Sequence, residues 1–418
     1  MVRVSGAAAG AALEALGGWR KPARQARLAR ISGADGRVID DALTLFFAAP
    51  HSATGEDVAE FHVHGGGAVI AAVLGALGRQ PGLRPAGPGE FTRRAFENGK
   101  FDLTQAEAVA DLIDAETEAQ RRQAVRQLDG ELGRLYAGWA ERLGRLLAHA
   151  EAGLDFSDED LPANLEADFG NQILALQREI ADHLDDGERG ERLRAGYYVA
   201  IIGAPNVGKS TLLNRLARRD AAIVAATGGT TRDVIEVHLD IGGFPVVVAD
   251  TAGLGVASGA VEAEGVRRAR ARAGAADLTL AVFDAGTWPT EDVETAALVD
   301  ERTIRVWNKL DLAPAAFAAD GVLVSALNGV GLDRLEEALR DRVAAEAPAV
   351  AGAPLLTRQR HRQALESCAG TLERALEARA ELRAEDLRLA LRSLARITGR
   401  VDVEDLLDTI FADFCIGK

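Results

Sequence analysis

One eight-residue stretch constrains the fold of this chain more than any other. It reads GAPNVGKS at residues 203–210, after an apolar run at 197–202 and before a helix-like segment at 211–216. In such a loop, glycines let backbone N–H groups surround phosphate oxygens, Lys209 supplies a cation for the terminal phosphates, and Ser210 offers a hydroxyl to Mg²⁺. The order strand, loop, helix therefore predicts a P-loop, and an ordinary glycine turn is the alternative.

A second motif further along the chain predicts which base the bound nucleotide carries. Apolar runs at 278–283 and 303–307 precede NKLD at residues 308–311, and a run at 322–324 precedes SAL at 325–327. An aspartate that ends an NKxD stretch can accept hydrogen bonds from N1–H and the 2-amino group of guanine, a donor pair that adenine lacks. These motifs, in this order on alternating strands and helices, predict a doubly wound domain that binds GTP.

The γ-phosphate chemistry is predicted from the segments between these motifs. An apolar run at 245–249 ends in DTAG at 250–253, where Asp250 is placed to hold the Mg²⁺ shell through water. Leu254 follows, and leucine cannot orient the attacking water as the glutamine of Ras-like enzymes does. Glu262 is the nearest acid that could do so, and a solvated glutamate is the alternative.

Two cations are predicted at the phosphates. In the glycine-rich loop, Thr230 or Thr231 could close the second protein contact to Mg²⁺ when the γ-phosphate is present. Asn206 could offer its amide oxygen to a monovalent cation, with Thr230 and backbone carbonyls of the loop completing the shell. A potassium ion placed there would supply the positive charge that other GTPases take from an arginine.

Length and composition narrow the class of protein. The 418 residues predict two or three domains, and the net charge of −15 argues against a general basic field that coats nucleic acid, so any RNA contact must be local. Two cysteines cannot form a disulfide framework, which fits a reducing compartment. The chain has neither a membrane-length apolar run nor a signal-peptide pattern, and we predict a cytoplasmic protein.

The pattern of the chain predicts an α/β and α multidomain protein. A helix is expected at residues 7–16 and strands at 43–47 and 58–64. The simplest organisation is a helical domain interrupted by an inserted P-loop domain, preceded by a mixed α/β domain. The predicted bounds are 1–98 for the α/β domain, 99–196 and 349–418 for the helical halves, and 197–348 for the GTPase domain.

One long helix with an apolar face is predicted in the first helical half. Its apolar positions recur at three and four, and arginines among acids occupy the other faces, which predicts a solvated surface or, alternatively, one that faces RNA. The apolar set is Leu128, Leu132, Leu135, Trp139, Leu143 and Leu146, and the arginines are Arg121, Arg122, Arg126, Arg134 and Arg142.

Taken together, these motifs resemble the MnmE (TrmE) family of bacterial tRNA-modification GTPases. Besides the P-loop with Asn206 and the DTAGL stretch, the resemblance rests on blocks that GTPases in general do not share. These are GTTRD at 229–233, GED at 55–57, HGG at 64–66, PGEFTRRAF at 88–96, LTQAEA at 103–108 and the terminal CIGK at 415–418.

The resemblance implies a reaction and its partners. Family members carry a folate-binding N-terminal domain, form homodimers through it, and hydrolyse GTP in a potassium-dependent way when their GTPase domains meet. With the flavoprotein MnmG they add a carboxymethylaminomethyl or aminomethyl group to C5 of the wobble uridine of certain tRNAs. The one-carbon unit comes from a tetrahydrofolate derivative of the 5,10-methylene or 5-formyl type.

Residue roles carried over from the family extend the predicted site. Mg²⁺ is assigned to Ser210 and Thr231, and K⁺ to Asn206, Thr230 and the backbone oxygens of Ala225 and Thr227. The catalytic residues are Glu262 and Lys209, the folate contacts are Arg3, Glu60, Lys100 and Lys418, and Cys415 is either a modification-site residue or a buried small residue. The predicted GTP contacts are Asn206, Val207, Gly208, Lys209, Ser210, Thr211, Ala225, Ala226, Thr227, Gly228, Gly229, Thr230, Thr231, Asp250, Thr251, Ala252, Gly253, Asn308, Lys309, Asp311, Ser325, Ala326 and Leu327.

Two competing interpretations stay open at this point. A regulatory GTPase of ribosome assembly would share the P-loop with Asn206 and the leucine after DTAG, but it would add a second P-loop or a GxxG RNA-binding module, and this sequence shows neither. An inactive, truncated relative is the other, because family members carry a further segment before the position of Met1. We expect a misassigned start codon to be the simpler explanation.

Overall fold

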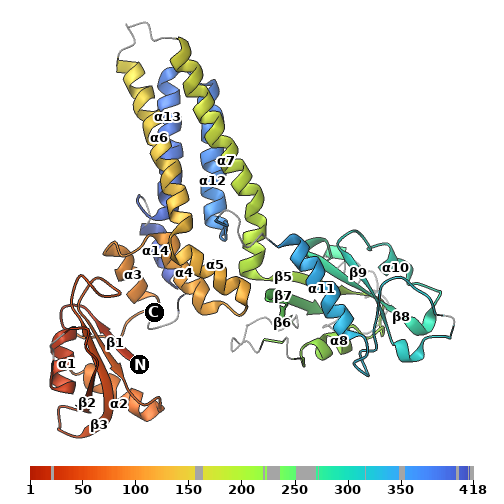
Figure 1. The fold of residues 1–418 in the computed structure, drawn as a ribbon, viewed down its shortest axis with the longest axis horizontal. Helices are drawn as coiled ribbons and strands as arrows, with labels where there is room; N and C mark the ends of the chain where they lie inside the picture. The colour runs from red at the N-terminus through yellow and green to blue at the C-terminus, as the bar shows by residue number, and fades with distance from the viewer. Residues whose placement is uncertain are drawn as a thin grey trace. The chain divides into compact units, whose positions relative to one another are not determined.

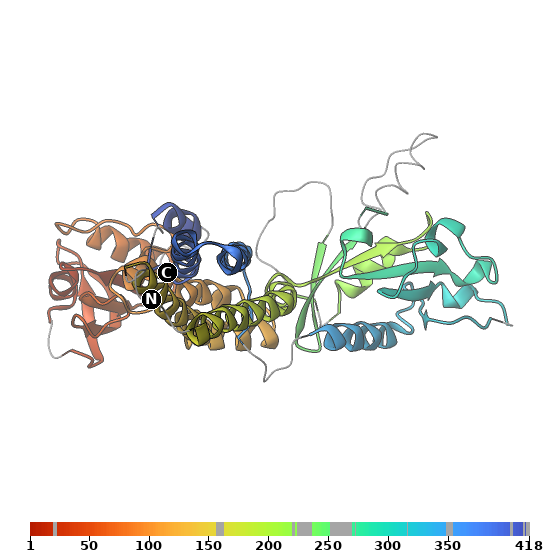
Figure 2. The same ribbon diagram turned by 90° about the horizontal axis from the view of Figure 1, so that it is seen from above.

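The structure is a computed structural model, shown in Figures 1 and 2. It divides into two compact units: Met1–Ala110 with Gln127–Leu165 and Gly370–Lys418, and Asp111–Arg126 with Glu166–Ala369. The described residues are 1–19, 23–155, 163–219, 222–223, 236–250, 270–271, 273–315, 317–347, 354–401, 404–412 and 414, and the side chains of 154, 155, 163–167, 250, 380, 381 and 404–406 are also left undescribed. Among these residues, no helix combines the length and apolar character that a membrane span needs.

The first unit begins with an antiparallel sheet in the strand order β1-β4-β3-β2. Helices α1 and α2 pack their apolar side chains against one face, where Leu13, Ile31 and Phe61 are fully buried. The predicted helix at 7–16 and the strand at 58–64 are confirmed within two residues, and the strand at 43–47 is confirmed as the second half of β3, whereas β2 and α2 were not foreseen. The elements are β1 (Val2–Ser5), α1 (Ala9–Gly17), β2 (Arg27–Ser32), β3 (Val38–Phe47), β4 (Val58–His62) and α2 (Gly67–Leu77).

Helices complete this unit, and they correct one prediction. The helix expected to carry Leu128 through Leu146 is two helices, because Gly130 adopts a left-handed φ of 80° and ends the helical hydrogen bonding. Leu128 closes the first helix, while Leu132, Trp139, Leu143 and Leu146 are buried along the second. The helices are α3 (Glu90–Glu97), α4 (Leu103–Asp114), α6 (Glu131–Asp155), α13 (Ala380–Thr398) and α14 (Glu404–Ala412), of which α4 continues into the second unit, whereas α5 (Glu118–Leu128) belongs to the second unit except for its last residues.

The second unit contains a six-stranded sheet in the order β10-β9-β8-β5-β7-β6. All strands are parallel except β6, which pairs with β7 as a hairpin that the sequence analysis did not foresee. The predicted runs before the DTAG, NKLD and SAL motifs are confirmed as strands. The elements are α7 (Ala163–Ala195), β5 (Tyr197–Ile202), α8 (Lys209–Leu216), β6 (Glu236–Ile241), β7 (Phe244–Asp250), β8 (Leu278–Asp284), η1 (Ala285–Thr287), α10 (Val293–Ala296), β9 (Thr303–Asn308), η2 (Leu310–Leu312), β10 (Val322–Leu323), α11 (Leu332–Glu346) and α12 (Gln359–Glu377), the last of which continues into the first unit.

Both faces of this sheet are covered, which explains why its strands are apolar without alternation. On one face, α8 and α11 pack with side chains such as Val199 and Leu280. On the other, Phe283 and Trp307 stack with ring centroids 5.2 Å apart. The chain therefore has the expected fold class: a P-loop GTPase sheet inserted between helical segments and preceded by a mixed α/β domain.

Candidate functional site

The P-loop lies between β5 and α8, at the carboxyl edge of the parallel strands. Its conformation depends on residues with positive φ: Gly203 at 151°, Asn206 at 65° and Gly208 at 97°. A Cβ at Gly203 would lie 2.5 Å from the carbonyl oxygen of Val282 on β8, so no other residue fits there. The glycine spacing read from the sequence thus reflects both backbone conformation and close packing.

Lys209 is the first residue of α8, and its side chain is folded over its own loop. The ammonium donates to the carbonyl oxygens of Gly203 at 2.7 Å and Ala204 at 2.8 Å, and the residue is only 8% exposed. A cation held over the crown of a P-loop can exchange these carbonyls for phosphate oxygens. Ser210 follows on the first turn of the same helix, where N–H groups attract anions.

Asn308 joins the P-loop to the base-recognition loop. Its amide nitrogen donates to the carbonyl oxygen of Val207 at 2.7 Å, and its amide oxygen accepts from the N–H of Ala326 at 2.9 Å. The side chain is 3% exposed, so both bonds are shielded from water. The structure thus shows that the asparagine of NKLD is a bridge between two loops that are far apart in sequence.

Asp311 has its carboxylate positioned by the SAL loop. The hydroxyl of Ser325 donates to one oxygen of Asp311 at 2.5 Å, and Ser325 itself is 2% exposed. The second oxygen of the exposed Asp311 has no hydrogen-bond partner in the described part of the chain. The hydrogen bond from Ser325 therefore orients the Asp311 carboxylate and leaves its second oxygen available as an acceptor, where the motif predicts guanine recognition.

Two further residues support this site and were not foreseen from the sequence. Asp284, at the end of β8, binds the ammonium of Lys309 at 2.7 Å and so holds a residue that has a positive φ of 61°. Arg215 on α8 donates to the carbonyl oxygens of Ala326, at 3.1 Å, and of Leu327. Asp284 could have been predicted from the sequence, because it directly follows the apolar run at 278–283. The role of Arg215 could not, because it depends on a contact between distant segments.

Several predicted residues lie outside the described part of the structure. The side chain of Asp250 is not described, although β7 ends at this residue, beside β5. The remaining residues of this kind are Ala225, Ala226, Thr227, Gly228, Gly229, Thr230, Thr231, Thr251, Ala252, Gly253, Glu262, Cys415 and Lys418.

In the N-terminal unit, the structure brings together two of the predicted folate residues. Arg3 on β1 stands opposite Glu60 on β4, and their side chains form an ion pair at 2.8 Å. The guanidinium of Arg3 also lies over the ring of Phe91, 5.8 Å from its centroid. Lys100 instead donates to the carbonyl oxygen of Pro50 at 2.9 Å.

A cavity of about 530 Å³ opens beside Arg3, within the size range of small-molecule sites. One part of its wall is charged and another is apolar. The charged residues are Arg3, Glu56, Arg84, Glu90 and Arg94, and the apolar ones include Leu74, Leu77, Leu83 and Phe91.

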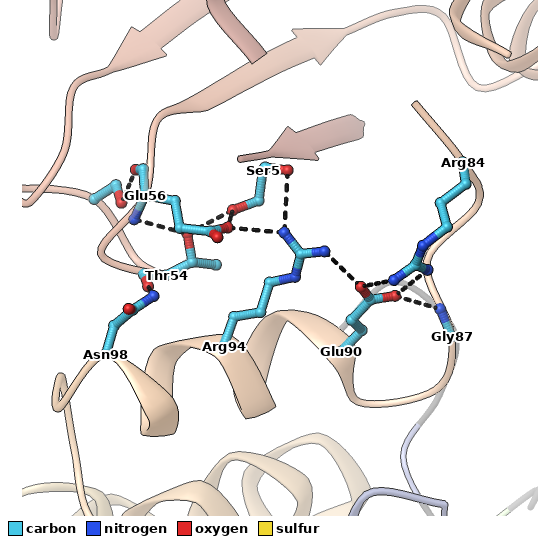
Figure 3. A network of polar contacts seen from close by, with 9 residues as sticks. Ser5, Thr54, Glu56, Arg84, Gly87, Glu90, Arg94 and Asn98 are labelled. Atoms are coloured by element: carbon cyan, nitrogen blue, oxygen red, sulfur yellow. Dashed lines mark hydrogen bonds and ion pairs between the residues drawn. The ribbon is translucent and has the colours of Figure 1, made fainter. Parts of the chain in front are cut away.

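Apart from Arg3, the charged residues of this wall form a connected network, shown in Figure 3. Glu90 accepts from Arg84 at 2.6 Å and from Arg94 at 2.7 Å, and Arg94 reaches Glu56, which in turn accepts from Ser5 at 2.8 Å. The hydrogen bond from Arg84 is the largest cause that lowers the pKa of Glu90 to about 2, with further contributions from the N–H of Gly87 and from Arg94. The PGEFTRRAF block therefore corresponds to a helix, α3, whose Arg94 forms an ion pair with Glu56, two residues before β4.

Comparison with known proteins identifies the family. The model of the MnmE helical domain matches residues 103–415, and that of the GTP-binding protein TrmE N-terminus matches residues 1–100. The tRNA modification GTPase MnmE of Rhodospirillum rubrum is 58% identical over all of this chain and 96% of its own length, and that of Parvibaculum lavamentivorans has the same values. This chain belongs to the MnmE family of tRNA modification GTPases.

Membership in the MnmE family confirms the resemblance drawn from the sequence motifs, and it favours tRNA modification over ribosome assembly. Among solved structures, a crystal structure of Aquifex aeolicus Era bound to GDP.AlF4- is 26% identical to this chain, covers 44% of it and 67% of the Era chain, and has a TM-score of 0.28.

Proposed function

We propose that this chain hydrolyses GTP and, with an MnmG-type flavoprotein, adds a carboxymethylaminomethyl or aminomethyl group to C5 of the wobble uridine of certain tRNAs. The observation that carries the proposal is the family match over the whole chain, combined with a P-loop and a base-recognition loop that Asn308 joins. The predicted bounds of the three domains belong to the same proposal.

In the proposed GTPase step, described side chains bind and orient the nucleotide. Lys209 neutralises the terminal phosphates, and Asp311, held by Ser325, selects guanine. Mg²⁺ would be held by Ser210 and Thr231, and its charge would stabilise the phosphates as they separate. Hard cations prefer oxygen ligands, so these hydroxyls fit the group.

Potassium would be held by Asn206, Thr230 and the backbone oxygens of Ala225 and Thr227, and Glu262 would orient the attacking water. The positive φ of Asn206 supports part of this proposal, because it places an amide side chain at a turn of the phosphate loop. Asparagine tolerates this conformation better than other residues with a Cβ, which gives a reason for its presence.

Folate would bind in the N-terminal unit of a homodimer, in contact with Arg3, Glu60, Lys100 and Lys418. The cavity beside Arg3 supports this, because its charged and apolar walls suit a flat polar ring system with a carboxylate tail. Arg3 lines this cavity, and its ion pair with Glu60 holds the guanidinium there, where it can form hydrogen bonds with such rings.

Nucleoside mass spectrometry of bulk tRNA tests the proposal. The strains are the wild type, a deletion of this gene, and the deletion complemented with the 418-residue chain. We expect the C5-modified wobble uridine to disappear on deletion and to return on complementation. Unchanged modification in the deletion strain would refute the proposed function, and ribosome profiles from the same strains would then test the assembly alternative.

A further inference from the structure

A line of arginines runs along the exposed face of α13, and we call it the arginine stripe: Arg388, Arg392, Arg396 and Arg400. The spacing is four residues throughout, and all four residues are exposed. Residues four apart lie near one face of a helix, so Arg388, Arg392 and Arg396 lie on the same side of α13, with successive Cα atoms about 6 Å apart along the axis. Arg400 follows the helix, and its N–H still bonds the carbonyl oxygen of Ala395 at 2.9 Å.

The other face of α13 fixes the stripe in position. Leu387, Ala390, Leu394 and Ile397 are at most 1% exposed, and the helix packs beside α6 of the same unit (Figure 1). Because this apolar face is buried, the helix cannot rotate to turn the arginines away from solvent. The stripe is therefore a permanent feature of the surface.

The segment that carries the stripe contains no acid of its own, although acids flank it at Glu385 and Asp402. Residues 387–401 contain no Asp or Glu, although 63 of the 418 residues are acidic. Arg388 is paired with Glu151 and Glu385, and Arg392 also has an interaction within the protein. The guanidiniums of Arg396 and Arg400 form no hydrogen bond or ion pair with any residue that the structure describes. In a chain of net charge −15, this is a local positive surface of the kind that an RNA contact would need.

A groove of about 790 Å³ runs along one side of the stripe. Arg388, Arg392 and Arg400 line it on one side, and among the described residues of its wall the one acid is Glu141 of α6, which is bound to Arg145. Of the lining residues that the structure describes, one is aromatic, Tyr136, and it is only 1% exposed, so this part of the groove offers no exposed aromatic anchor of the kind found at protein-docking sites. We therefore expect charge, and not apolar contact, to determine what binds to this surface.

Other arginines of the helical segments, unlike Arg396 and Arg400, bind acids or backbone carbonyls within the protein. Arg121 and Arg122 both bind Glu118, at 2.7 and 2.6 Å. Arg134 donates to the backbone carbonyl of Asp129 at 2.7 Å. These contacts favour the solvated interpretation for residues that the sequence analysis had considered as a surface facing RNA.

We propose that the arginine stripe binds the phosphate backbone of the tRNA substrate, an inference that rests on the proposed function. Guanidinium groups form paired hydrogen bonds with phosphate oxygens, and a row of them along a helix can follow successive phosphates of one strand. Such contacts position the RNA without reading its sequence. The choice of wobble uridine would then be made elsewhere on the assembled enzyme.

Binding of a fluorescent, unmodified tRNA transcript by the full chain, measured by anisotropy over a series of salt concentrations, tests the proposal. The variant carries Arg392→Gln, Arg396→Gln and Arg400→Gln, because glutamine removes charge but keeps helix propensity. The matched control carries Arg121→Gln, Arg122→Gln and Arg145→Gln, which removes the same charge elsewhere. A third protein replaces the three stripe arginines by lysine.

We expect the stripe variant to bind roughly tenfold or more weakly near 0.1 M salt, and its salt slope to fall by about 2 to 3, because each lost phosphate contact removes about 0.7 to 0.9. The control should stay within about twofold of wild type, and the lysine protein should keep most of the slope. GTP hydrolysis without tRNA should be equal in all four proteins.

Three results would overturn the inference. Equal losses in the stripe variant and the control would show an effect of bulk charge. Normal tRNA binding by the stripe variant, with loss of binding to the flavoprotein, would make the stripe a protein-docking surface. If the wild-type chain shows no salt-dependent tRNA binding, the inference fails; if deletion of the gene also leaves the wobble uridine modified, the proposed function fails with it.

Discussion

Replacement of Asp311 by asparagine tests the base-recognition site most directly. Asp311 presents one oriented carboxylate oxygen while Ser325 holds the other at 2.5 Å. Asparagine keeps the size of the side chain and one oxygen, but it loses the charge and gains an N–H₂ donor. That donor faces the 2-amino group of guanine unfavourably, and it suits the carbonyl oxygen that xanthine carries at the same position.

The expected magnitude follows from the two hydrogen bonds to guanine. A hydrogen bond to a charged group contributes about 1.5 to 3 kcal/mol. Because Asp311 is exposed, we take the lower end for each of the two bonds, which gives about 3 kcal/mol, or roughly a 100-fold loss of GTP affinity. Affinity for xanthosine triphosphate should rise by a similar factor.

Competition of GTP and xanthosine triphosphate against a fluorescent guanine nucleotide measures both changes. Asp320→Asn is the matched control, because Asp320 is exposed in the same unit and Trp307 contacts its backbone carbonyl. The control should leave both affinities unchanged. If the Asp311→Asn protein keeps its preference for GTP, the argument that this carboxylate reads guanine is wrong.

Three further changes probe the cation site, the catalytic water and the N-terminal network. Asn206→Ala should abolish the stimulation of GTP hydrolysis by K⁺ relative to Na⁺, and an unchanged ratio would contradict the role of the amide. Glu262→Ala should leave GTP binding within about twofold while it cuts turnover at least ~100-fold, a typical contribution of a residue that acts on the attacking water; wild-type turnover would exclude the assignment. Glu90→Gln should lower the free energy of unfolding at pH 7 by up to about 3 kcal/mol, because the pKa falls from 4.5 to about 2 on folding. This stabilisation is complete above pH 4.5 and is lost as the pH falls toward 2, so urea unfolding should show the gap between the variant and wild type narrow from pH 5 to pH 3.

The sequence by itself determined the class of the nucleotide site. The P-loop, the NKLD stretch and the apolar strands before them are local patterns, because glycine conformations and buried parallel strands leave a signature over a few neighbouring residues. For the same reason, the fold class and the family could be recognised before any coordinates. The same local reasoning failed at Gly130, where periodicity continued across a residue whose positive φ ends the helix.

Tertiary structure decided how these pieces connect. Asn308 bridges Val207 and Ala326 across about 100 and 18 residues of chain, and Arg215 reaches the loop of Leu327, contacts that no spacing rule indicates. The sequence also did not show that the arginine stripe is a surface. Only the burial of the opposite face of α13 shows that the arginines face solvent. Hydrogen bonds and packing between distant segments depend on how the chain folds back on itself, and that is information which a local sequence pattern does not carry.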